Sequence, residues 1–204
     1  MIIHIFTKES IVSFNFMQFV NKNFRTEDHF FVFRKGTLKY EYEMDVEKRI
    51  IMVTNRYFFI FKLYPMLRKA KLIIFHSFPV GPSLYFWFLF PGLLRKVVWR
   101  IWGSDIHFFQ YHWEGIRSKV FEWIRKRLIK RIKVVAGPVD GDFPILKNVY
   151  GSEAKFIYGR YPSPVDKDYL DKLKSTHEKI ISKKILLGNS ATSENEHLIM
   201  LDKL

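Results

Sequence analysis

The sequence contains no cysteine. A disulfide framework and a cysteine metal site are therefore excluded, and the composition fits a reducing compartment. We also expect no secretory signal, because the apolar start MIIHIF is too short and no basic segment precedes it. Hydrophobic burial must then hold the fold together, and a chain of 204 residues that is 48% hydrophobic can bury a sizeable core.

A long uninterrupted hydrophobic run is also missing. The longest apolar stretch, Phe78–Leu94, is just short of a membrane span and is broken by Pro79, Pro82 and Pro91. Its pattern predicts a buried helix that starts at about Ser83. We therefore expect a protein that touches a membrane without crossing it.

Acidic residues are in the minority. The chain has 20 Asp and Glu residues against 34 Lys and Arg residues, which gives a net charge of +14. Such a surface favours an anionic partner, which can be a nucleic acid, an acidic membrane leaflet or a phosphorylated ligand. The charge alone does not choose among these partners.

Short apolar runs alternate with segments of helical periodicity along the first three quarters of the chain. The predicted strands are Ile2–Phe6, His29–Phe33, Lys48–Val53, Lys71–Phe75, Lys96–Trp102, Ile132–Ala136 and Lys155–Tyr158. The predicted helices are Ser13–Phe24, Tyr57–Leu67, one from about Ser83, Ile116–Arg131 and Asp140–Tyr150. This alternation predicts an α/β fold with a parallel sheet, whose ligands bind beyond the carboxyl ends of the strands.

The composition changes after residue 158. Residues 159–182 carry two prolines and many charges, which is typical of a linker. Residues 183–204 then predict one strand and the start of one helix. Because these two elements cannot bury their own faces, they either extend the first sheet or begin a second domain that is truncated.

The loop after this last strand reads GNSATSENEH. Gly188 allows a tight turn, and Ser193 can cap a helix with Glu196 as its capping-box partner. A helix start of this kind presents free N–H groups to a phosphate. The same pattern is also compatible with an ordinary capped helix that binds nothing.

Two segments carry a resemblance to a known family. G-N-S followed by S-x-N-E-H, together with WRIWGSDIHFF, resembles the TDP-Fuc4NAc:lipid II Fuc4NAc transferases of glycosyltransferase family 56. The first strand IIHIF and the stretch FHSF fit the family pattern less specifically. The resemblance spans nearly the whole chain in family order.

The resemblance implies a GT-B architecture, in which two Rossmann-like domains face each other across a cleft. Residues 1–158 would hold the acceptor, and residues 183–204 would begin the donor-binding domain. The implied reaction moves 4-acetamido-4,6-dideoxygalactose from dTDP to a polyprenyl-diphosphate-linked saccharide, as in the synthesis of enterobacterial common antigen. It implies no cofactor and a peripheral place on the cytoplasmic face of the bacterial inner membrane. The substrate-binding residues it suggests are Trp102, Gly103, Ser104, Gly188, Asn189, Ser190, Asn195, Glu196 and His197.

In one way we expect the chain to differ from the family: nearly all of the donor-binding domain would be missing after Leu204. We therefore expect that this chain alone does not transfer sugar. The chain would be a fragment, a truncated gene product or one part of a split hexosyltransferase.

Asp105 is the main catalytic candidate. The KVVWRIW strand is expected to end near Trp102, and Gly103 lets the chain turn there, which puts Asp105 at the carboxyl edge. Its carboxylate can take the proton of an attacking sugar hydroxyl, grip the acceptor, or simply cap the turn. His76 ends the neighbouring strand and is the second candidate, either as a base or as a hydrogen-bonding group for the acceptor.

The segment 116–133 predicts a basic amphipathic helix. Its apolar stripe must pack against a core, while its excess of positive charge favours an anionic leaflet or a diphosphate lipid. The membrane-binding residues predicted there are Arg125, Lys126, Lys130 and Arg131.

The remaining polar clusters predict no metal site. Asp140-Gly141-Asp142 matches a D-x-D pattern, and Asp166-Lys167-Asp168 is a second copy, but the first favours a turn and a capped helix start. The spacing of Asp105, His107 and His112 is not that of a metal site. His4, inside a predicted strand, is interpreted as a core histidine.

Two other functions compete with the glycosyltransferase hypothesis. The first is a non-catalytic accessory or degenerate protein that binds a glycolipid or a membrane. The second is a basic nucleic-acid-binding domain, which the absence of a recognised binding motif disfavours. Many aromatic residues also lie in apolar runs typical of a core and not of a base-stacking platform.

Overall fold

The computed structural model describes residues 1–7, 9–34, 39–53, 62–107, 115–162 and 171–172. The chain divides into two compact units, Met1–Pro164 and Val165–Leu204. All helices and strands named below lie in the first unit. The predicted linker 159–182 and the predicted start of a second domain at 183–204 fall mostly outside the described residues and stay predictions.

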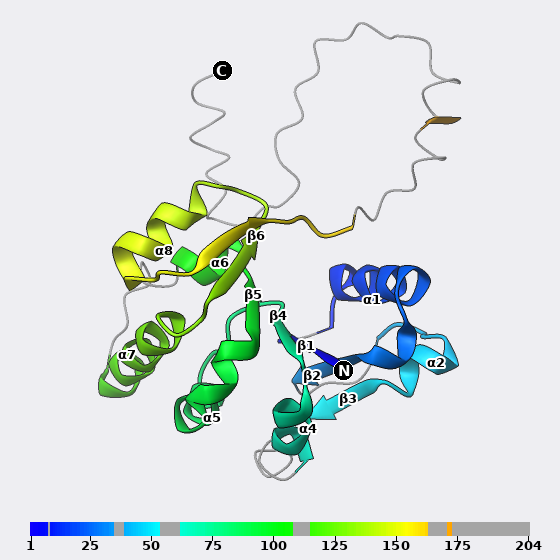
Figure 1. The fold of residues 1–204 in the computed structure, drawn as a ribbon, viewed down its shortest axis with the longest axis horizontal. Coiled ribbons are helices and arrows are strands. Elements are labelled where there is room, and N and C mark those ends of the chain that lie inside the picture. The colour runs from blue at the N-terminus through cyan, green and yellow to red at the C-terminus, as the bar shows by residue number, and fades with distance from the viewer. Residues whose placement is uncertain (8, 35–38, 54–61, 108–114, 163–170, 173–204) are drawn as a thin grey trace, which may run out of the picture. The chain divides into compact units, whose positions relative to one another are not determined.

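The first unit is built on a seven-stranded sheet in the order β3-β2-β1-β4-β5-β6-β7 (Figure 1). Every neighbouring pair of strands is parallel. The strands are β1 (Ile2–Phe6), β2 (His29–Arg34), β3 (Ile50–Val53), β4 (Leu72–Phe75), β5 (Val97–Arg100), β6 (Val134–Gly137) and β7 (Lys155–Tyr158). This confirms the predicted α/β fold with a Rossmann-like parallel sheet.

Helices cover both faces of this sheet. They are α1 (Ile11–Asn23), α2 (Met44–Glu47), α4 (Tyr64–Lys69), α5 (Ser83–Leu89), α6 (Gly103–Ile106), α7 (Ile116–Ile129) and α8 (Asp142–Tyr150), with short 3-10 helices η1 (Thr26–Asp28) and η3 (Pro91–Lys96). α1 starts at a capping box in which the Ser10 side chain accepts a hydrogen bond from the Ser13 backbone N–H. The Ser13 hydroxyl accepts in turn from the Ser10 backbone N–H, so two N–H groups at the helix start that lack a partner within the helix are satisfied.

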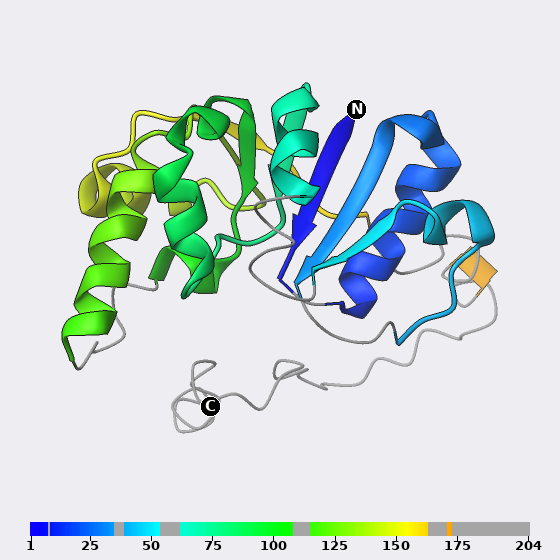
Figure 2. The same ribbon diagram turned by 90° about the horizontal axis from the view of Figure 1, so that it is seen from below.

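The sheet separates two hydrophobic cores. The larger core contains residues of α4, α5, α7 and α8 together with one face of the strands, including Ile3 and Phe75. The smaller core lies under α1 and contains the opposite face, including Phe6 and Phe31. Figure 2 shows α1 on one side of β1, and α5 and α7 on the other. Because side chains alternate along a strand, residues 4 and 6 of β1 face α1 while residue 3 faces the larger core.

The predicted strands are confirmed with small changes at their ends. The largest change is in the predicted strand Lys96–Trp102, which is shortened to Val97–Arg100. The chain turns at Trp102, the N-cap residue of α6, which the sequence did not predict. The helix predicted from Ser83 is α5, and none of the helices in the described ranges is long and apolar enough to cross a membrane.

Candidate functional site

The strand order reverses between β1 and β4, which are neighbours in the sheet. From β1 the sheet continues to β2 and β3, and from β4 it continues to β5, β6 and β7. Such a reversal opens a crevice at the carboxyl ends of the strands, which is the usual ligand site of parallel sheets. Thr7, His76 and Ser77 follow β1 and β4 directly. A small pocket there is lined by the Thr7 and Ser77 side chains, whose hydroxyls contact each other, and by apolar groups such as Trp87.

His76, predicted as a candidate base, is buried at this edge. Its ring stacks on Phe6 with 3.9 Å between centroids. Its Nδ1 is 2.5 Å from the hydroxyl of Tyr161, and its Nε2 is 3.0 Å from Nδ1 of His4. Burial and the nearby positive charge of Arg100 hold the pKa of His76 well below its usual value. The imidazole is therefore neutral at physiological pH.

His4 continues the contact from His76 into the core. Its Nε2 lies 2.9 Å from Nδ1 of His29, the first residue of β2. Burial lowers the pKa of His4 to about 3, and burial also lowers the pKa of His29. The prediction of a core histidine at position 4 is confirmed, since both of its ring nitrogens have buried partners. His76, His4 and His29 are called the histidine row from here on.

Tyr161 covers the outer end of the histidine row. The guanidinium of Arg100 lies 3.8 Å from the centroid of the Tyr161 ring, and the centroids of the Trp102 and Tyr161 rings are 5.2 Å apart. Burial raises the pKa of the Tyr161 hydroxyl to about 12, so it stays protonated. Sequence reasoning missed this residue because it follows the last strand inside a segment interpreted as a linker. Only its aromatic character among charged and proline residues could have indicated a packed position.

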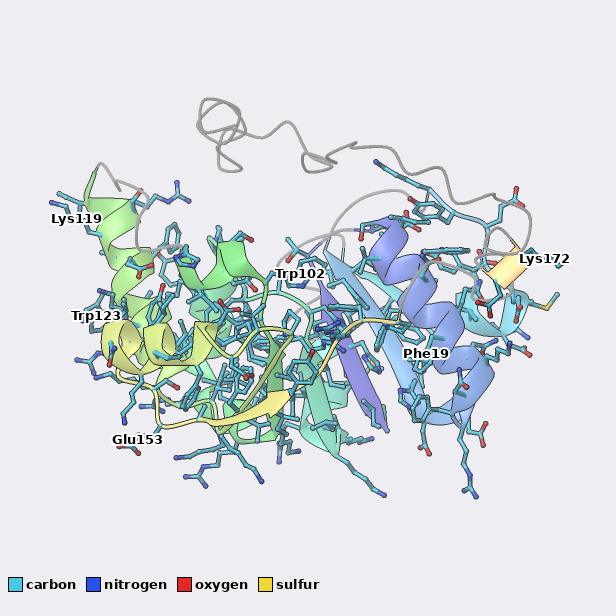
Figure 3. All side chains as sticks on the ribbon, turned by 90° about the horizontal axis from the view of Figure 1, so that it is seen from above. Phe19, Trp102, Lys119, Trp123, Glu153 and Lys172 are labelled. Carbon is cyan, nitrogen blue, oxygen red and sulfur yellow. The ribbon has the colours of Figure 1, made fainter. Side chains whose placement is uncertain are left out.

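Trp102 lies beside this pair at the rim of the site. Its indole Nε1 donates a 2.6 Å hydrogen bond to the backbone carbonyl of His76, yet 40% of its surface remains exposed (Figure 3). Gly103 and Ser104 form the exposed first turn of α6. The structure thus brings Trp102 together with His76 and Tyr161, and leaves an aromatic face open at the carboxyl edge.

The Asp105 carboxylate is held by the segment after β4 and by strand β5. One carboxylate oxygen, Oδ2, accepts hydrogen bonds from the Phe78 backbone N–H at 3.1 Å and from Trp99 Nε1 at 3.3 Å. Burial raises the pKa of Asp105 to about 6, against the lowering effect of these bonds. The carboxylate therefore ties the segment after β4 to β5 and α6. These bonds favour the turn-capping interpretation of Asp105 that the sequence left open.

Arg125 does not belong to the exposed basic surface predicted for α7. Only 1% of its surface is exposed, and it donates hydrogen bonds to the Tyr150 hydroxyl at 3.2 Å and to the Asp105 backbone carbonyl. The prediction that Arg125 binds a membrane is therefore wrong. The reason is the helical period, because position 125 shares the inward face with Ile124 and Leu128.

The other three predicted membrane-binding residues are exposed. Lys126, Lys130 and Arg131 line a groove between the ends of α7 and α8, together with Arg127. Whether this surface binds a membrane stays a prediction.

The described part of the chain contains no group of three His, Asp or Glu side chains that could hold a metal ion. Asp140 and Asp142 lie in the turn that begins α8, so the predicted turn and helix start are confirmed. The predicted Asp cap is wrong, because the N-cap residue is Gly141 and no side chain bonds to the helix start there. His112 and the second D-x-D copy lie outside the described residues. The predicted substrate-binding residues of the second domain also lie outside the described residues; they are Gly188, Asn189, Ser190, Asn195, Glu196 and His197.

Comparison with known proteins connects this geometry to a family. A family model described as 4-alpha-L-fucosyltransferase glycosyl transferase group 56 matches residues 20–204. No curated protein matches the chain. The matched region includes most of the sheet, His29, His76, Trp102, Asp105 and Tyr161.

Proposed function

Because the chain belongs to glycosyl transferase group 56, we propose that it acts in the transfer of 4-acetamido-4,6-dideoxygalactose from a dTDP-sugar to a polyprenyl-diphosphate-linked saccharide. The family match carries the general activity, that of a glycosyltransferase. The particular sugar and acceptor rest on the resemblance of the WRIWGSDIHFF and GNS segments. The proposal extends to the GT-B arrangement, in which residues 183–204 begin the donor side.

The carboxyl edge offers the groups that an acceptor needs. An attacking sugar hydroxyl must lose a proton as it reaches the anomeric carbon, and a positioned base can take it. The pair of Tyr161 and His76 lies at the carboxyl ends of the strands, where the strand order reverses, and its hydrogen bond joins two groups that can each give or take a proton. The Asp105 carboxylate instead accepts hydrogen bonds from Phe78 and Trp99, which occupy its Oδ2. We assign proton removal to the Tyr161–His76 pair and a positioning role to Asp105.

Trp102 and Arg100 give this edge its binding character. The exposed indole of Trp102 is a rigid apolar face of the size of a sugar ring. Arg100, the last residue of β5, carries a positive charge beside Tyr161, and its buried Nε has no hydrogen-bond partner in the described part of the chain. A saccharide linked to a diphosphate matches this pairing of an apolar face with a cation.

Acceptor binding is tested with a short-chain prenyl-diphosphate disaccharide and the 204-residue chain. We expect binding, seen as a change of tryptophan fluorescence, and about 10-fold weaker binding by Trp102→Leu, since a buried aromatic contact contributes about 1 kcal/mol or more. Tyr85→Leu, an exposed aromatic on α5, is the matched control. Absence of binding, or tighter binding of duplex DNA at the same salt concentration, contradicts the proposal.

Transfer is measured separately, with dTDP-sugars and other nucleotide sugars as donors. If the chain alone transfers no sugar, it is assayed as a fusion to the donor domain of another group 56 member. Transfer from the dTDP-sugar supports the enzyme. A chain that binds the acceptor but transfers nothing in either form supports the accessory alternative.

A peripheral membrane surface is part of the proposal. On α7 the exposed cations Lys119, Lys126 and Lys130 flank Trp123, and Trp123 lies 5.6 Å from Phe88 of α5 between ring centroids. Figure 3 shows Lys119 and Trp123 projecting from α7. Aromatic side chains at an interface and cations at phosphate headgroups are the two attractions that hold proteins on anionic leaflets.

Replacing Lys126, Lys130 and Arg131 together with Gln is expected to weaken sedimentation with anionic vesicles about 100-fold, because each cation contributes about 1 kcal/mol near such a surface. The matched control replaces the exposed cations Lys22, Arg25 and Lys48 with Gln, which removes the same charge from the α1 side. Equal loss in both variants would mean that only net charge matters and that α7 is not a membrane surface.

A further inference from the structure

The histidine row runs along the α1 face of the sheet, from the carboxyl ends of the strands to their amino ends. His76 follows the carboxyl end of β4, His4 lies in the middle of β1, and His29 is the first residue of β2. The register explains the alignment, since Ile2 pairs with His29 and Ile5 with Phe75. Three strands, distant in sequence, thus place three imidazoles in one hydrogen-bonded line.

The geometry restricts how hydrogens are distributed in this line. A neutral imidazole carries one N–H, so each ring donates with one nitrogen and accepts with the other. Nε2 of His76 meets Nδ1 of His4, and Nε2 of His4 meets Nδ1 of His29. If His76 donates from Nε2, then His4 and His29 must also carry their hydrogen on Nε2. If the direction reverses, all three carry it on Nδ1. The row therefore has two states, and each state fixes one shared tautomer.

Tyr161 selects between these states at the outer end. In the first state its hydroxyl donates to Nδ1 of His76, and in the second it accepts from that nitrogen and can donate outward. At the inner end His29 keeps 8% of its surface exposed and lies near the charges of Asp28, Arg49 and the N-terminus. The line thus connects the carboxyl ends of the strands with a histidine that keeps a small exposed fraction and has three charges nearby.

We propose that the histidine row is a proton relay, which leads the proton of the acceptor hydroxyl from Tyr161 to His29. This inference rests on the proposed function. As the acceptor oxygen attacks, its proton moves to the Tyr161 oxygen, and the hydroxyl proton of Tyr161 moves to Nδ1 of His76. The Nε2 proton of His76 then moves to Nδ1 of His4, and the same step repeats from His4 to His29. The Nε2 proton of His29 passes to water.

All three rings end in the second state, and no ring becomes charged. After the product leaves, the steps run backwards: His29 takes a proton from water, and Tyr161 gives one to water at the open edge. A buried single base would instead have to hold a positive charge beside Arg100, which burial opposes. The relay avoids this cost because no histidine of the row is left with a positive charge after the transfer.

The test is a tautomer measurement on the full chain labelled with ¹⁵N-histidine, by long-range ¹H–¹⁵N correlation near pH 7. We expect the three rings to share one tautomer. Tyr161→Phe, which keeps the packed ring and removes only the hydroxyl, is expected to change the tautomer populations of His4 and His29. Tyr158→Phe, at the exposed end of β7, is the control and should change neither. Different tautomers within the row, or unchanged signals at His29 in Tyr161→Phe, overturn the relay.

A second measurement links the relay to the acceptor. Saturation with the prenyl-diphosphate disaccharide, whose hydroxyl donates to Tyr161, is expected to drive His29 toward the Nε2–H tautomer. If the disaccharide binds and the His29 signals stay unchanged, the relay does not serve the acceptor and the inference fails. If the disaccharide does not bind, the proposed function fails, while the shared tautomer and the Tyr161→Phe result still decide whether the row is coupled.

Discussion

Lowering the pH from about 6.5 to about 4.5 is expected to lower the free energy of unfolding by about 2 kcal/mol more in the wild-type chain than in the His4→Phe variant, since one pKa unit corresponds to about 1.4 kcal/mol and the unfolded histidine is already half protonated at the start. The folded pKa of His4 is about 3, below its ordinary value of 6.5. The unfolded chain therefore binds a proton at this position first, and the stability present above pH 6.5 is lost as the pH falls toward 3. Urea unfolding at several pH values measures the difference.

Asp105 acts in the opposite direction over part of the same window. Its folded pKa is about 6, above the ordinary value of 3.8, so the folded chain takes up this proton first as the pH falls. Asp105 thus adds stability on acidification between these two values. The contribution of Asp105 cancels in the comparison with His4→Phe because Asp105 is present in both chains. Parallel pH profiles of the two chains would contradict a buried neutral His4.

His76→Gln is expected to lower kcat for sugar transfer by about 10²–10⁴-fold with little change of the donor KM, as the loss of a general base does. Gln retains a polar side chain of similar reach, so the Trp102 bond to the backbone carbonyl of residue 76 can persist. The measurement is steady-state transfer by a form that shows turnover, alone or fused to a donor domain.

Asp105→Asn is the matched comparison. Because Asn retains a carbonyl oxygen that can accept from the Phe78 backbone N–H, the segment after β4 stays joined to α6, and kcat is expected to remain within about 10-fold of wild type. A loss of about 10²-fold or more in Asp105→Asn, with a smaller loss in His76→Gln, would return the role of base to Asp105.

The sequence predicted the sheet well because each buried strand of a parallel sheet is a short continuous apolar run. KLIIF and IIHIF are examples, and both were placed within one residue of their observed bounds. The rule that ligands lie after such strands also pointed to His76, which the structure places at the switch point. The family followed from the WGSD and GNS segments, and the family match confirmed it.

The predicted end of β5 was less accurate. The apolar pattern of KVVWRIW continues to Trp102, but the strand ends at Arg100 because the chain turns into α6. Arg125 shows a related difficulty, since a charge on an amphipathic helix is expected to face water. Its guanidinium instead lies against Tyr150 and the backbone of Asp105, partners 25 and 20 residues away. Local periodicity cannot report such long-range partners.

By itself, the sequence determined the alternation of strands and helices, the parallel sheet and the family, since these depend on local patterns and short motifs. Only the tertiary structure decided that His4, His29, His76 and Tyr161 form one line. Their separations of 25, 72 and 85 residues are closed by strand register and by the path of the chain after β7. A hydrogen bond needs its two atoms within about 3 Å, and no pattern along the chain carries that distance.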